Sequence, residues 1–347
     1  MQSKSQAPSI TTGPITAQLL LFFFPILLGT FFQQLYNTVD TIIVGNFVGT
    51  NTALAAVGGA TGQLVNLFVG FFIGLSSGCG VIISQYYGAR DQNAVSKSVH
   101  TALAFSLLSG VVIMVLGLLL TDFSLRAMSL PEEIMPEATA YLRIFFLGMI
   151  PNLFYNMGAA VLRAIGDSKR PLYFLILSCL CNIVLDLIFV AHLRLGVSGA
   201  ALATILSQLA SAVMVLFVLL RTKSDVRLIP SQLRLEPFWL KKMIYVGLPA
   251  GLQSTMYTVS NIIVQATINS FGTNTIAAVT AYGKMDVIFW MVINAFGIAI
   301  TTFVGQNYGA GKTERAFRGF RAALLLAAIG TLLLSGIIWL FGMNFLL

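Results

Sequence analysis

The sequence predicts an all-α membrane protein built as two lobes of transmembrane helices, and three observations lead to this prediction. Of the 347 residues, 57% are hydrophobic and only 9% are charged, whereas about 25% of the residues of a soluble domain are charged. Apolar segments long enough to span a bilayer as helices recur along the whole chain. An internal repeat relates the first part of the chain to the second. A surface this poor in charge must face lipid over most of its area.

Nine apolar segments are predicted to cross the membrane, and several exceed the roughly 20 residues that a straight span needs. In chain order they are residues 15–48, 53–87, 99–120, 138–162, 172–191, 199–220, 243–271, 275–304 and 323–347. We therefore predict an N-terminal lobe of six helices (1–222), a cytoplasmic linker (223–240) and a partial C-terminal lobe of three helices (241–347).

The distribution of basic residues predicts the orientation of the chain. Most of the 20 Lys and Arg residues fall in connections on the same side as the N-terminus, and such an excess marks the cytoplasmic side. The net charge of +8 is therefore assigned to the cytoplasmic face and not to a nucleic-acid site. We expect a multi-pass protein of the cell (plasma) membrane whose N-terminus is cytoplasmic.

Three pairs of matching segments define the repeat, each offset by about 220 residues, as between Thr38 and Thr258. The pairs are 38–44 with 258–264, 50–57 with 273–279, and 85–90 with 306–311. Six spans separate the copies, so both enter the bilayer from the same side. Such parallel repeats, related by an axis along the membrane normal, occur in secondary transporters. The second copy contains three spans where the first has six, so we expect the second lobe to be truncated or completed by something else.

The first predicted span carries a polar stripe inside an apolar helix. Gln33, Tyr36, Asn37 and Asp40 share one helix face because their spacings are three and four residues. An aspartate within a membrane span costs roughly 2.5–3.5 kcal/mol on insertion scales, so it usually faces a protein interior or a watery cavity. We predict that Asp40 carries a coupling proton and that Gln33, Tyr36 and Asn37 line the substrate path. Pro25 weakens the hydrogen-bond ladder of the same helix and is a candidate hinge.

Four features together resemble the multidrug and toxic compound extrusion (MATE) family, closest to its DinF-like branch. They are the run Gln33 to Asp40, the loop Arg163 to Pro171, the paired Gln-x-Tyr-Gly-Ala ends of the second and eighth spans, and the basic linker between the lobes. The resemblance implies twelve helices in two six-helix lobes, so about three are lacking here. It also implies a transporter and not an enzyme, which exports amphipathic, often cationic compounds in exchange for protons or sodium ions.

DinF-like transporters place a proton-binding network at positions that match Asp40, Asn156, Asn182, Asp186 and Thr204. Span order alone puts Asp40, Asp186 and Thr204 at similar depth, with Asn182 one turn from Asp186. Two neighbouring acids in a desolvated site can share a proton. The resulting hypothesis is antiport by alternating access, in which protonation of Asp40 and Asp186 accompanies a rearrangement of the first span. The alternative is that polar neighbours merely satisfy these acids and that the amides and Thr204 hold helices together.

Lys284 and Asp286, near the middle of the eighth span, are predicted to pair with other helices or to lie on the substrate path. Sodium-coupled relatives carry a glutamate on the seventh helix, whereas no acid occurs between Lys241 and Met285, so proton coupling is favoured over sodium coupling.

A flippase for lipids or lipid-linked sugars is the nearest rival, with Lys284 as its sole support. We predict no cofactor and no metal site, and amphipathic small molecules and the lipid bilayer as partners of a monomeric transporter.

Overall fold

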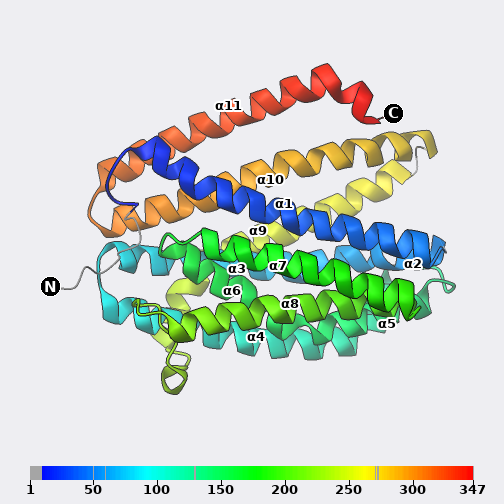
Figure 1. Cartoon of the computed structure of the whole chain (residues 1–347), viewed down its shortest axis with the longest axis horizontal. Coiled ribbons are helices and arrows are strands. Elements are labelled where there is room, and N and C mark those ends of the chain that lie inside the picture. The colour runs from blue at the N-terminus through cyan, green and yellow to red at the C-terminus, as the bar shows by residue number, and fades with distance from the viewer. Residues whose placement is uncertain are drawn as a thin grey trace.

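The described residues are mostly helical and include no strand (Figure 1). A computed structural model describes residues 10–49, 51–58, 60–128, 130–269, 271 and 273–346. The helices are α1 (Ile15–Phe47), α2 (Asn51–Gly58), α3 (Ala60–Gly88), α4 (Gln92–Ala127), α5 (Met135–Leu147), α6 (Met149–Ala164), α7 (Lys169–Asp186), α8 (Gly196–Arg221), α9 (Pro237–Asn269), α10 (Thr273–Gly309) and α11 (Thr313–Leu346). Two short elements join them, a π-helical turn at Leu187–His192 and a 3-10 turn at Pro230–Gln232. The prediction of an all-α membrane fold is confirmed.

The number of spans differs from the nine that the sequence predicts. Within the described residues, seven helices are long and apolar enough to cross a membrane, and the bent pair α5 and α6 makes an eighth. Helix α9 is not among them, although its 33 residues would reach about 50 Å at 1.5 Å per residue. Polar side chains such as Lys241, Gln253 and Asn261 lower its hydropathy. Instead, α9 packs along α3 in the most extensive helix pair of the described structure.

The predicted fourth span is not one straight helix. It is divided at Gly148, where α5 and α6 meet at a bend of 50°. Pro151 follows the break and lacks the backbone N–H that would continue the hydrogen-bond ladder. A side chain at position 148 would also collide with Ile205 of α8. Pro151 thus gives the bend a local cause, and the absent side chain of Gly148 leaves room for α8 at the bend.

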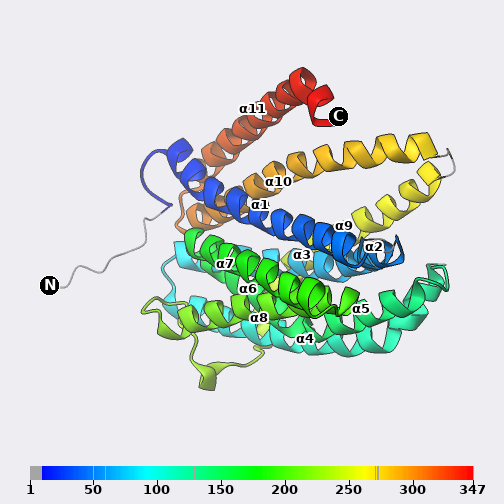
Figure 2. The same ribbon diagram turned by 45° about the vertical axis from the view of Figure 1, so that its right-hand side comes forward.

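We call helices α1 to α8 the first part of the bundle and helices α9 to α11 the second part. Helix α1 contacts helices of both parts. It packs against α7 on one side and against α10 and α11 on the other, as Figures 1 and 2 show. The contact with α10 contains a stacked pair of rings, Phe23 and Phe296, with centroids 3.9 Å apart. Helix α11 diverges from the rest of the bundle toward its C-terminal end (Figure 2). The division into lobes at residues 222 and 241 remains a prediction.

Glycines allow α3 to approach α9 and α10 at backbone distance. Gly74 and Gly78 of α3 lie directly against Gly251 and Gly247 of α9, with no room for a Cβ atom. Small residues spaced by four permit such close helix packing in membranes. The run of glycines in the second span is thus a helix-packing surface.

The repeated Gln-x-Tyr-Gly ends meet each other where α3 and α10 terminate. Gly88 lies against the backbone of Gln306, and Gly309 lies against the backbone of Gln85, so each copy supplies the same two contacts to the other. The Gln306 Nε2 also donates to the carbonyl oxygen of Ala164 at 2.7 Å. These contacts close the bundle at the end where the N-terminal segment lies.

We expect Gly78→Val to destabilise the protein by about 1–3 kcal/mol, because the new side chain must push α9 away from α3. Gly297→Val is the matched control, since a Cβ at Gly297, also inside a long helix, meets nothing within 4 Å. Thermal unfolding of both purified variants in detergent measures the difference. Equal midpoints would contradict the backbone contact between α3 and α9.

Candidate functional site

A polar cavity of about 270 Å³ lies among the first helices of the bundle. Its described lining contains one acid, Asp40, and no Lys, Arg or His. The lining residues are Gln33, Tyr36, Asn37, Asp40, Thr41, Val57, Gly58, Gly62, Val65, Asn66, Val69, Tyr141, Phe145, Asn152, Tyr155, Asn156, Leu175, Ser178, Thr204, Gln208 and Ser211. Amide and hydroxyl side chains dominate this list, which is unusual for the interior of an apolar bundle. A cavity of this composition suits a solute that carries positive charge and hydrogen-bonding groups.

The structure brings most of the predicted residues to this one place. Six of them line the cavity directly: Gln33, Tyr36, Asn37, Asp40, Asn156 and Thr204. Asn182 and Asp186 of α7 are fully buried and do not line it. Asp286 belongs to α10 and lies outside the cavity, and Pro25 is an interior residue of α1. Lys284 is part of α10, but its side chain is outside the described part of the structure.

The two predicted acids lie close enough for their charges to interact. Asp40 is 6% exposed and Asp186 is fully buried. Among the described residues, no group donates a hydrogen bond to the Asp40 Oδ1 or to either carboxylate oxygen of Asp186. Burying an ionised carboxylate without partners is costly. Binding a proton removes that charge, so this pair is suited to proton exchange.

The local structure of α7 sets the place of Asp186. Asp186 is the last residue of α7, and the π-helical turn Leu187–His192 begins at the next residue. Such wide turns shift the register of the residues that follow and are frequent at functional sites. The Ser178 Oγ donates to the carbonyl oxygen of Ser207 in α8 at 2.9 Å. This bond fastens α7 to the helix that carries Thr204.

Several residues that line the cavity were not predicted from the sequence. Tyr141 of α5 is buried, lines the cavity, and interacts with the charges of both acids. Asn152 accepts a hydrogen bond from the Asn156 Nδ2 to its Oδ1 at 2.8 Å, and Gln208 lies beside Tyr36. A spacing of four residues relates Asn152 to Asn156 and Thr204 to Gln208. These helical polar stripes were a usable signal, whereas nothing in the sequence marks Tyr141.

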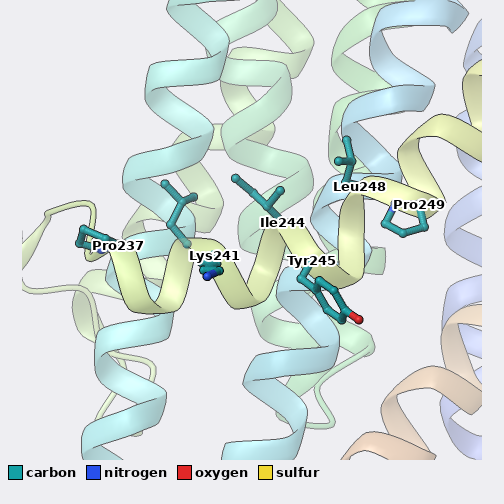
Figure 3. Close-up of a pocket in the computed structure, with 7 residues that line it drawn as sticks. Pro237, Lys241, Ile244, Tyr245, Leu248 and Pro249 are labelled. Carbon is teal, nitrogen blue, oxygen red and sulfur yellow. The ribbon is translucent and has the colours of Figure 1, made fainter.

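A second hollow, of about 570 Å³, lies on α9 (Figure 3). Its lining is Pro237, Leu240, Lys241, Ile244, Tyr245, Leu248 and Pro249. Among these residues Lys241 is the one charged side chain, and no acid is present. The hollow lacks the convergent polar groups that orient a ligand in a binding site. The cavity beside Asp40 is therefore the candidate functional site.

The helical bundle and its polar interior cavity define a multi-pass membrane protein of the transporter class. The MatE family model matches residues 25–188 and 249–347. The probable multidrug resistance protein YpnP of Bacillus subtilis is 31% identical over 341 residues, which cover 97% of this chain and 75% of that protein. YoeA of the same organism, also a probable multidrug resistance protein, is 30% identical over 93% of this chain and 72% of its own. The chain belongs to the MatE family of multidrug efflux transporters.

A solved structure of the same kind agrees with this assignment. The outward-facing conformation of a multidrug resistance MATE family transporter of the MOP superfamily superposes with a TM-score of 0.92 at 26% identity. The match covers 99% of this chain and 76% of that one. The prediction of the family is confirmed, and the assignment to the DinF-like branch remains a prediction.

We expect a cysteine at Asn37 to react with a charged, water-soluble thiol reagent at least about tenfold faster than one at Ile42. Both positions lie on α1 and are exposed, but only Asn37 lines the cavity. Thiol reactions need the thiolate, which forms in water and not among lipid chains. Labelling of the two variants in membranes, with Cys79, Cys179 and Cys181 replaced by Ser, measures the rates. Equal rates would show that the Asn37 side of α1 does not face water.

Proposed function

We propose that this protein is a secondary active exporter that exchanges amphipathic, often cationic compounds for protons by alternating access. Asp40 and Asp186 are the proposed proton-coupling carboxylates, with Asn156, Asn182 and Thr204 as the network around them. Gln33, Tyr36 and Asn37 form the substrate path beside Asp40. The coupling ion is H⁺, and the proposed transporter uses no cofactor.

One observation carries this proposal: Asp40 lines a polar cavity, Asp186 is buried close enough to Asp40 for their charges to interact, and three of their four carboxylate oxygens accept no hydrogen bond from described residues. In the ionised state Asp40 attracts a cation in the cavity, where no basic residue among the described lining residues opposes it. When protons bind, the charge disappears and the cation loses its partner. Substrate and protons therefore compete for the same carboxylates, which is the thermodynamic requirement for exchange.

The packing of α1 supports a way to connect the two events. Helix α1 carries Asp40 and contacts both α7 and α10, so a change in its path alters the packing between the two parts of the bundle. Pro25 interrupts the hydrogen-bond ladder of α1 and supplies a place where the helix can bend. The glycine contacts at Gly88 and Gly309, where α3 and α10 end, keep that end of the bundle closed while protons enter the cavity from the other side. Release on the other side requires these contacts to separate.

Orientation and setting complete the proposal. The N-terminus lies in the cytoplasm of a cell whose plasma membrane holds the protein as a monomer. The closed end with Gln306 then faces the cytoplasm, and the cavity loads protons from the outside.

The decisive experiment is Asp40→Asn in proteoliposomes loaded with ethidium. We expect efflux driven by a pH gradient to fall at least about tenfold, because the amide cannot exchange a proton, while each tenfold loss corresponds to about 1.4 kcal/mol of barrier. Asp122→Asn is the control, since Asp122 pairs with Arg143 at the exposed surface (2.7 Å) and is not among the residues that line the cavity. Unchanged efflux in Asp40→Asn would refute the proposed role.

A second measurement separates the coupling ions. We expect a pH gradient without sodium to drive ethidium efflux from wild-type proteoliposomes, and a sodium gradient at constant pH to leave the rate at its leak value. The substitution Asp186→Asn should abolish the pH-driven component as Asp40→Asn does. Efflux that follows sodium alone would replace proton coupling by sodium coupling.

A further inference from the structure

We propose that the second part of the bundle holds an organic-cation site of its own, formed by Tyr257, Tyr282, Asp286 and Trp290. This site deepens the proposed export function, on which it rests for its physiological meaning, but its ligand binding is independent of proton coupling at Asp40. The ligand class is a compound with a quaternary or delocalised cationic group beside aromatic surface.

The side chains of this group lie together on two helices. Tyr282, Asp286 and Trp290 follow one another at intervals of four residues along α10, which places them on one face. The Tyr282 hydroxyl donates to the Asp286 Oδ1 at 3.3 Å. Across from them, the ring of Tyr257 in α9 meets the ring of Trp290 edge-on, with centroids 5.1 Å apart and an interplanar angle of 62°. Tyr257 also interacts with Tyr282.

Within the described part of the chain, these rings are partly exposed. Tyr282 is 63% exposed, Tyr257 is 47% exposed and Trp290 is 41% exposed. An edge-on pair leaves the face of one ring free, and a free indole or phenol face attracts a cation within about 6 Å of its centroid. The Asp286 carboxylate, held in place by the Tyr282 hydroxyl, adds a negative charge beside those faces. Aromatic faces combined with one acid are the recognised chemistry for binding quaternary ammonium groups.

The internal repeat supplies an independent argument for the location. The match of Thr258 to Thr38 pairs Tyr257 with Asn37. The match of Gln306 to Gln85, continued along the unbroken helices α10 and α3, pairs Asp286 with Val65 and Trp290 with Val69.

All three partners, Asn37, Val65 and Val69, line the cavity of the first part. Three of the four residues of the proposed site therefore correspond, through the repeat, to lining residues of the first cavity. Its chemistry differs, because an acid and two rings replace an amide and two valines around it.

Binding of tetraphenylphosphonium to the purified, detergent-solubilised protein tests this proposal. We expect Asp286→Asn and Trp290→Leu each to weaken binding by about tenfold or more in isothermal titration. Asp286→Glu should restore most of the affinity, which a merely structural role would not predict for a longer side chain. Asp122→Asn and Trp339→Leu are the matched controls, since neither residue belongs to the site and both are exposed.

Triphenylphosphine oxide, a neutral compound of similar shape, is the matched probe and should bind at least about tenfold more weakly. Equal binding of the neutral and charged probes would show an apolar surface and overturn the cation site. Wild-type affinity in both Asp286→Asn and Trp290→Leu would overturn it as well, and so would a wild-type protein that binds no phosphonium.

The variant Asp40→Asn separates this proposal from the proposed coupling mechanism. We expect it to retain the binding that depends on Asp286 while it loses pH-driven efflux. If Asp40→Asn abolishes all binding and Asp286→Asn leaves it unchanged, the second site is wrong and the proton-coupled cavity stands. If Trp290→Leu fails to give folded protein, Tyr257→Leu in the same assay tests the same rings from α9.

Discussion

Burying two carboxylates inside an apolar bundle is the constraint on which the rest of this structure depends. Lipid offers no partner to a charged or polar side chain, so such groups must face one another across helices. Here the polar faces of α1, α6, α7 and α8 converge on one cavity, with Asp40 at its wall and Asp186 buried beside it. The other faces of these helices are apolar and can face lipid. This arrangement keeps both acids inside the bundle and away from lipid.

The internal repeat provides the frame that holds this cavity. The Gln-x-Tyr-Gly ends of α3 and α10 pack against each other through Gly88 and Gly309. In each copy the glycine contacts the glutamine backbone of the other copy. Because the two backbones are in direct contact, the helices resist small shifts at this end, and a larger side chain at either glycine would push them apart. The repeat preserved the frame while the chemistry around it changed. The first part carries acids and amides, and the second carries an acid among aromatic rings.

Much of the fold and part of the site could be predicted from the sequence. Apolar length fixed α1 to within one residue at its C-terminal end, Val48 against Phe47, because a helix in lipid must satisfy every backbone hydrogen bond within itself. The polar stripe of α1 followed from helical spacing alone. The break at Gly148 was not predicted, although Gly148 and Pro151 are both visible in the sequence; the close approach of Ile205 from α8 to Gly148 is a contact that only the tertiary structure shows. Helix α9 forms where the sequence predicts the seventh span, Pro237–Asn269 against 243–271, although it is less apolar than the other long helices, and it packs along α3.

The sequence by itself determined that this is a helical membrane protein with a repeated frame, which local rules of hydropathy and periodicity express residue by residue. It also determined that Asp40 needs an interior partner, because an isolated acid cannot remain among lipid chains. Only the tertiary structure decided which groups surround that acid. Tyr141, Asn152 and Gln208 come from three other helices, and no periodicity within one helix encodes contact with another. The distance between side chains on separate helices is fixed by how the helices pack, which is a property of the whole bundle.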